Sequence, residues 1–107
     1  MEIQIKTSGV SGAKKFRGIA AKHIGAAIGR VGHIVQSVSV RLSDMQKPRG
    51  VADKLCRVVI QMKGRFVVLE ELGPDMARVI ERAAIRVQTT IAGQGGARRP
   101  IGATQPA

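Results

Sequence analysis

The stretch RLSDMQKPRGVADKLCRV, residues 41–58, predicts the end of one β-strand, a basic loop, and a second strand that begins at Lys54. Pro48 and Gly50 lie within the loop, and both residue types favour turns over continued strand pairing. The residues on either side of the loop alternate between apolar and polar, as they do in strands with one buried face. The stretch therefore predicts two neighbouring antiparallel strands joined by a loop at residues 44–53.

The same alternation predicts four strands along the chain, at residues 2–6, 34–42, 54–62 and 66–72. Lys63 and Gly64, between the last two, form a tight hairpin-turn signal. One side of these strands is apolar and is expected to face the core. On the first three strands this side comprises Ile3, Ile5, Val38, Val40, Leu42, Cys56, Val58, Ile60 and Met62.

A first amphipathic helix is predicted at residues 13–30, with Ser11 as its N-cap and Gly32 as its end. Its apolar stripe comprises Phe16, Ile19, Ala20, Ile24, Ala27, Ile28 and Val31. The helix also contains three glycines, each of which weakens a helix by about 1 kcal/mol relative to alanine. Close packing against a sheet is expected to offset that cost.

A second helix is predicted to start at Gly73-Pro74-Asp75 and to end at Gly93. Proline suits the first turn because its missing N–H would have no partner there, and an aspartate is favoured at the positive end of the helix dipole. The buried stripe of this helix comprises Met76, Ile80, Ala83, Ala84, Val87 and Ile91.

The predicted order of elements is β-α-β-β-β-α. Strands joined through a helix are parallel, and strands joined by short loops are antiparallel, so the sheet is expected to be mixed. Both helices then cover one face of a four-stranded sheet in a two-layer α+β domain. The other face should expose Ser37, Ser39, Arg41 and Arg57. We assign the domain to residues 1–93, and the Gly, Pro and Gln content of residues 94–107 predicts a disordered tail.

The charge of the chain points to a polyanionic partner. Eighteen Lys and Arg against seven Asp and Glu give a formal net charge of +11, which attracts nucleic acid first and anionic membrane second. Only 2% of the residues are aromatic, so base-stacking platforms are not expected. RNA contacts should therefore run through phosphates and shape. If about six cations neutralise phosphates, the log–log salt slope should be about −4 to −5.

The candidate RNA-binding residues form three groups. Arg78, Arg82 and Arg86 are four residues apart on the second predicted helix, where only Asp75 and Glu81 are near in the sequence. An ordinary solvated face is the alternative, but the clustering favours phosphate binding. Lys22 and Arg30 belong to a more scattered set on the first helix, with Lys14, Lys15 and Arg17. Lys47, Arg49 and Lys54 lie in or beside the loop, a kind of segment that often carries function.

Enzymatic chemistry is not expected, and neither is a cofactor, a metal ion or a small-molecule substrate. His23 and His33 have no carboxylate at ligand spacing. Asp44 and Asp53 could pair as acid and base in principle, but as loop ends they are expected to meet nearby Arg and Lys. Cys56 lies on an apolar strand face, where a small buried hydrophobe is the simplest interpretation.

The compartment follows from what the sequence does not contain. A single cysteine cannot form an internal disulfide, which indicates a reducing compartment. The start of the chain, MEIQIKTSG, lacks the pattern of a signal peptide, and charged residues interrupt every apolar run of bilayer length. We therefore expect a cytoplasmic protein.

RLSD (residues 41–44), PRG (48–50) and DK-x-C-R-V (53–58), within this order of elements, resemble the ribosome hibernation promoting factor and ribosome-associated inhibitor family. The resemblance covers about residues 1–92. It implies a fold akin to double-stranded-RNA-binding domains. It also implies docking to rRNA in the decoding region of the small ribosomal subunit, over the messenger and transfer RNA sites. Basic family positions match Arg30, Arg82 and Arg86.

The sequence also departs from the family pattern. Val31 replaces a usual aromatic residue, Lys47 replaces a glycine, and residues 88–92 are neutral where family members often carry further basic residues. The C-terminal dimerisation domain of the long family members has no counterpart after Gly93. The chain is therefore expected to be a monomer away from the ribosome.

Three functional hypotheses follow. The first is a short ribosome-associated translation inhibitor that acts by occupying the small subunit. The second is a regulatory module of the same fold that presents its sheet face or its loop to an acidic protein. The third, membrane association through residues 13–30, is disfavoured by the glycines and the moderate apolar stripe of that helix.

Overall fold

The computed structural model describes residues 2–29, 34–45 and 53–96, and within these residues it contains four strands and two helices. The strands are β1 (Glu2–Ser8), β2 (Val35–Asp44), β3 (Lys54–Met62) and β4 (Arg65–Gly73). The helices are α1 (Ala13–Gly29) and α2 (Met76–Gly96). The predicted order β-α-β-β-β-α is confirmed.

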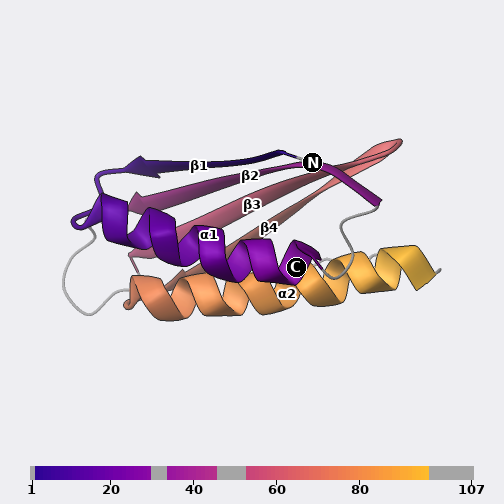
Figure 1. The fold of residues 1–107 in the computed structure, drawn as a ribbon. Coiled ribbons are helices and arrows are strands. Elements are labelled where there is room, and N and C mark those ends of the chain that lie inside the picture. The colour runs from indigo at the N-terminus through magenta and orange to yellow at the C-terminus, as the bar shows by residue number, and fades with distance from the viewer. Residues whose placement is uncertain (1, 30–33, 46–52, 97–107) are drawn as a thin grey trace.

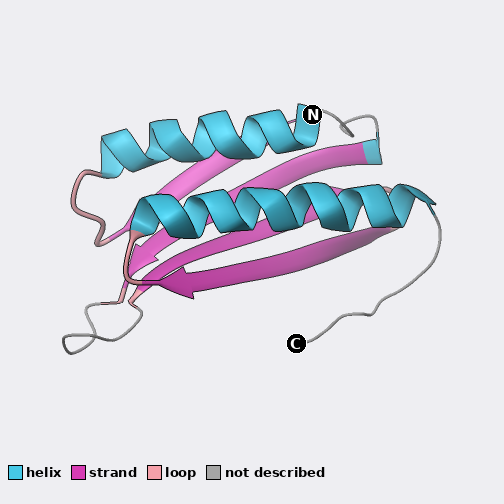
Figure 2. Cartoon of the chain, turned by 90° about the horizontal axis from the view of Figure 1, so that it is seen from below, coloured by secondary structure: helices cyan, strands magenta, loops and turns pink. Residues whose placement is uncertain are grey.

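The strands form one sheet in the order β1-β2-β3-β4. β1 is parallel to β2, while β2, β3 and β4 are mutually antiparallel neighbours. Both helices pack side by side against one face of the sheet, and no described helix or strand covers the other face, here called the open face (Figures 1 and 2). The predicted two-layer α+β architecture with a mixed sheet is therefore confirmed.

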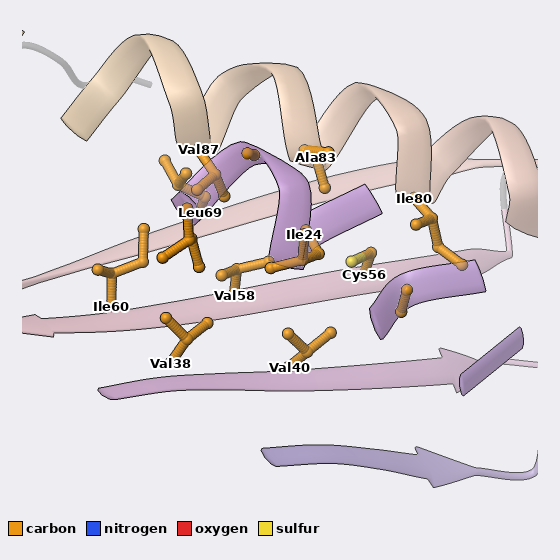
Figure 3. Packing of buried hydrophobic residues seen from close by; sticks show 14 of the residues in the cluster. Ile24, Val38, Val40, Cys56, Val58, Ile60, Leu69, Ile80, Ala83 and Val87 are labelled. Atoms are coloured by element: carbon orange, nitrogen blue, oxygen red, sulfur yellow. The ribbon is translucent and has the colours of Figure 1, made fainter. Parts of the chain in front are cut away.

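The core lies between the sheet and the helix layer. Val38 pairs with Ile60, Val40 with Val58, and Leu42 with Cys56, so that these residues share one face of the sheet. Figure 3 shows Val38, Val40 and Val58 directed toward the helices, where Ile24, Ala83 and Val87 meet them. All these residues are buried, as the alternation of apolar residues predicted. The predicted stripe of α2 is buried throughout, together with Val79, which the prediction omitted.

The starts of the two helices differ in detail from the prediction. Gly12, at φ +73°, immediately precedes α1, and its carbonyl accepts a hydrogen bond from the Phe16 N–H at 3.1 Å. Ser11, the predicted N-cap, lies one residue earlier. In α2 the N-cap is Asp75, whose Oδ1 accepts from the Ala77 N–H at 3.0 Å. Pro74 therefore precedes the cap and does not enter the first turn.

α2 continues to Gly96, so the predicted end at Gly93 is wrong. The predicted disordered tail falls on residues 94–107. Of these, residues 94–96 are helical and residues 97–107 lie outside the described part of the chain. The assignment of the domain to residues 1–93 stays a prediction.

The glycines of α1 do not lie in close contact with the sheet, contrary to the prediction. A Cβ added at Gly18, Gly25 or Gly29 would meet nothing within 4 Å. Close contact with the sheet therefore does not offset their cost to the helix.

Candidate nucleic-acid interface

Five of the eight predicted RNA-binding residues fall in the described part of the chain, and they are Lys22, Lys54, Arg78, Arg82 and Arg86. The other three, Arg30, Lys47 and Arg49, lie outside it. The five do not form one surface of equivalent cations. They divide into two arginines bound to β4, one lysine bound between strand ends, and two exposed cations on the helices.

Arg82 and Arg86 both bind Glu71, a residue of β4 that the sequence analysis did not connect to them. Arg82 Nε donates to Glu71 Oε1 at 3.2 Å, and Arg86 Nη1 donates to Glu71 Oε2 at 2.8 Å. Each arginine also bonds the backbone of β4, to the Leu72 carbonyl at 2.7 Å and the Glu70 carbonyl at 2.9 Å respectively. The expectation that only Asp75 and Glu81 balance these arginines is therefore wrong.

These bonds also cover the free edge of the sheet. β4 is an edge strand, and an exposed edge presents unpaired backbone groups to other chains. Residues two apart on a strand direct their carbonyls to the same side, so the bonds to Glu70 and Leu72 act on one side of β4. Arg82 and Arg86 thus tie α2 to the edge strand and occupy part of its hydrogen-bonding capacity.

The two arginines keep part of their positive charge for other partners. Two guanidinium groups share one carboxylate, and each arginine side chain is 48% exposed. A guanidinium has five N–H donors, of which the bonds to β4 use only some. Arg82 and Arg86 are therefore weaker anchors for a phosphate than free arginines, yet they still present positive charge on the surface of α2.

Gly73 makes room for Arg82 at the end of β4. A Cβ at this position would lie 2.9 Å from Arg82 Nη2 and 2.9 Å from Val79 Cγ2. Val79 is fully buried and cannot give way easily. Close packing therefore requires a glycine at position 73. The sequence pattern indicated Gly73 only as part of a helix start.

Lys54 connects the two strands that flank the central loop. Its Nζ lies 2.8 Å from Asp44 Oδ2 and 3.5 Å from Asp53 Oδ2. The hydrogen bond to Asp44 raises the pKa of Lys54, and the negative charges of Asp44 and Asp53 act in the same direction. Two carboxylates surround one ammonium, so Lys54 links the end of β2 to the start of β3. This placement confirms that Asp44 and Asp53 meet a nearby cation, and it does not support Lys54 as a phosphate ligand.

Lys22 and Arg78 are exposed, and within the described residues neither side chain forms an ion pair. Lys22 belongs to α1, which also carries exposed Lys14, Lys15 and Arg17 and contains no acidic residue. Phosphates are drawn to unbalanced cations. The outer surface of the helix layer, here called the helix surface, is therefore the best candidate for polyanion binding. Five of its cations form no ion pair with any described residue, and they are called uncompensated below: Lys14, Lys15, Arg17, Lys22 and Arg78.

The described residues hold neither a cluster of metal ligands nor an ionised thiol. No group of three His, Cys, Asp or Glu side chains among them could hold a metal ion. Burial raises the pKa of the Cys56 thiol to about 12, with a further contribution from the charge of Glu71, so the thiol is protonated and enclosed at neutral pH. No described helix is long and apolar enough to cross a membrane.

Fold and surface together define a small α+β protein with a mixed four-stranded sheet and a cationic helix layer. No protein-family model and no curated protein sequence matches the chain. Solved structures of other proteins share this fold, among them the following two.

The first is a ribosomal subunit interface protein from Coxiella burnetii. Its TM-score is 0.74 at 13% identity, over 91% of this chain and 100% of that one. The second is the N-terminal domain of Thermus thermophilus Protein Y. Its TM-score is 0.66 at 19% identity, over 85% of this chain and 96% of that one. The resemblance to ribosome-associated proteins predicted from the sequence is thereby confirmed at the level of the fold.

Proposed function

We propose that this protein is a ribosome-associated translation inhibitor that binds rRNA of the small subunit at the decoding region and blocks the messenger and transfer RNA sites. The observation that carries the proposal is the fold shared with a ribosomal subunit interface protein along that protein's whole length. The surplus of cations on the helix surface supplies a physical reason for binding RNA. The protein would act in the cytoplasm, by occupancy and without a chemical step.

The helix surface is the proposed contact with rRNA. Lys22 and Arg78 would bind phosphates directly, since neither is committed to an acid among the described residues. Arg82 and Arg86 would contribute from the flank through N–H groups that their bonds to β4 leave open. Arg30, Lys47 and Arg49 stay candidates for the same role. Lys54 is not included, because Asp44 and Asp53 bind it.

Co-sedimentation of the full chain with purified small subunits tests the association. The wild-type protein should pellet with the subunit at low salt, and Lys22→Glu with Arg78→Glu should weaken binding by about tenfold or more, because like charges then face the phosphates. Lys63→Glu with Arg65→Glu is the matched control, since it also reverses two exposed charges, in the β3–β4 hairpin of the sheet and not on the helices. Equal loss in the control and the helix variants would contradict a contact through the helices.

Chemical probing of the small-subunit rRNA tests the location. Protection should centre on the decoding region, and bound messenger with transfer RNA should compete with the protein. Protection elsewhere would keep the association with the ribosome and refute the proposed block of the decoding region. If the protein does not sediment with subunits at any salt concentration, the function itself is refuted.

A further inference from the structure

The face of the sheet opposite the helices carries its own arrangement of charge. Lys6 on β1 pairs with Arg41 on β2, Arg41 with Arg57 on β3, and Arg57 with Glu70 on β4. All four residues are exposed. They alternate along their strands with residues of the core, so they lie on the face of the sheet opposite the helices. Directly paired residues on neighbouring strands have their Cβ atoms about 5 Å apart. The four residues therefore form one row across the sheet, here called the cationic row.

Like charges in direct cross-strand positions destabilise a sheet. The only acid in the cationic row is Glu70, whose carboxylate lies 3.6 Å from Arg57 Nη1. Lys6 and Arg41 form no ion pair within the described residues. The row thus keeps an unbalanced positive charge in the unbound protein, and an acidic partner would relieve its repulsion. A shallow depression lined by Ser39, Arg41, Arg57 and Val59 adjoins the two arginines.

The same face is apolar on its β3–β4 side. Phe66, Val68 and Leu72 of β4 are exposed by 63%, 42% and 48%. Val59 pairs with Val68, and Leu55 with Leu72, so that aliphatic pairs lie on both sides of the Arg57–Glu70 pair. Three large hydrophobic residues exposed on one strand indicate an interaction site more than scattered surface residues do.

We propose that the open sheet face binds a protein segment that is acidic and has an apolar side. Carboxylates of the partner would meet Lys6, Arg41 and Arg57, and its aliphatic side chains would cover Val59, Val68 and Leu72. Protein fits this face better than RNA, because the exposed hydrophobes are aliphatic apart from Phe66, and nucleic acid needs several aromatic platforms to use such a surface. The residues that carry this inference lie on the sheet and are not those of the helix surface.

Binding of designed probes to the full chain tests this proposal. One probe is a synthetic peptide with leucine at every third or fourth position and glutamate elsewhere, which can form an acidic helix with an apolar side. The second is polyglutamate of the same length, and the third is a short RNA duplex. The leucine-containing peptide should bind about tenfold more tightly than polyglutamate, because only it can bury the β4 side chains.

Two variants of the open face separate its charged and apolar halves. Arg41→Glu should weaken peptide binding by about tenfold, and Val68→Ser by about fivefold through lost apolar burial. Both replaced side chains are exposed, so thermal unfolding should stay close to that of the wild type. Arg78→Glu is the matched control on the helix surface, and it should leave peptide binding unchanged while weakening the RNA duplex.

Amide shifts in an NMR titration should locate the peptide on the four strands of the sheet, around Lys6, Arg41, Arg57 and Val68. Three results would overturn the proposal. One is equal binding of the two peptides, and another is peptide-induced shifts confined to α1 and α2. The third is a loss of RNA affinity in Arg41→Glu as large as that in Arg78→Glu, which would make the open face an RNA surface. Failure of the ribosome experiments alone would leave this proposal intact, because its probes do not involve the ribosome.

Discussion

Glu71 neutralises part of the positive charge of Arg82 and Arg86 on α2 and leaves the rest available to other partners. The four-residue spacing of Arg78, Arg82 and Arg86 correctly predicted one flank of a helix. It could not reveal that Glu71 binds two of the three, because the partners are 11 and 15 residues apart and meet only once α2 lies against β4. A cation pattern in sequence therefore predicts a charged surface, while its neutralisation depends on tertiary contacts.

Glu71→Gln should change stability and RNA affinity in opposite directions. The substitution removes a carboxylate bound by two half-exposed arginines, and such partly screened pairs cost about 1 kcal/mol to lose. It also adds one uncompensated positive charge beside Arg78, which should raise affinity for an RNA duplex about threefold at low salt. Thermal unfolding and fluorescence anisotropy measure the two effects.

Glu81→Gln provides the control for stability. Glu81 is exposed and forms no ion pair within the described residues, so its removal should change the free energy of unfolding by less than about 0.5 kcal/mol. If Glu71→Gln lowers RNA affinity, the bonded arrangement of Arg82 and Arg86 is itself the binding-competent one, and the interpretation of Glu71 as a neutralising group is wrong.

Cys56 should make the protein lose stability in alkaline solution. Burial raises the pKa of its thiol from 9.0 to about 12 in the folded state. Between these values the unfolded chain releases a proton that the folded chain keeps, so the thiol's contribution is complete below pH 9 and is lost as pH rises toward 12. The slope approaches about 1.4 kcal/mol per pH unit. Denaturant unfolding between pH 8 and pH 11 measures it.

Cys56→Ala separates this effect from the lysines. The chain has no tyrosine, so lysines are the other side chains that titrate strongly in this range. The bond to Asp44 raises the pKa of Lys54, so the stability that Lys54 contributes is also lost as pH rises. This loss should persist in Cys56→Ala. If the free energy of unfolding of Cys56→Ala falls with pH as steeply as that of the wild type, the thiol is not the cause of the loss.

At the scale of elements, the sequence predicted strands better than helix ends. β3 has the bounds that alternation gave it, Lys54–Met62, because every second residue is buried under the helices. The end of α2 was placed at Gly93, since glycine is a common stop signal, yet the helix runs through it to Gly96. A single glycine did not end α2, so a local signal gave the wrong helix end. The alternation along β3 extends over the whole strand and follows directly from which residues are buried.

Two glycine substitutions should have opposite effects. Gly18→Ala lies inside α1 with open space around the new Cβ, and it should stabilise the protein by about 0.5–1 kcal/mol by restricting the unfolded chain. Gly73→Ala should destabilise it by about 1–3 kcal/mol, because its Cβ would press on Val79 and displace Arg82 from the Leu72 carbonyl. Chemical denaturation compares them, and a stabilising Gly73→Ala would contradict the packing argument.

At the scale of the whole molecule, ion pairs neutralise cations at the sheet and its edge and leave those of α1 without an acidic partner among the described residues. Asp44, Asp53, Glu70 and Glu71 each bind a cation in or beside the sheet, whereas no described acid pairs with the lysines or Arg17 of α1. The net charge of +11 predicted a polyanion partner but not this division. The sequence alone does not show which cations the acids neutralise. Two of the acids, Glu70 and Glu71, lie on β4, and their partners depend on the register of β3 with β4 and on how α2 packs against β4.

The division of charge should appear in the salt dependence of RNA binding. If the five uncompensated cations of the helix surface meet phosphates, the log–log slope for an RNA duplex should be about −4. Lys22→Gln and Arg78→Gln should each make it shallower by about 1, while Lys63→Gln, which removes the same charge from the far hairpin, should leave it unchanged. Glu71→Gln should steepen the slope, because it releases charge on Arg82 and Arg86 for phosphates. Equal changes for all the lysine and arginine variants would mean that RNA responds only to the net charge of the protein, and a specific helix surface would then have no support.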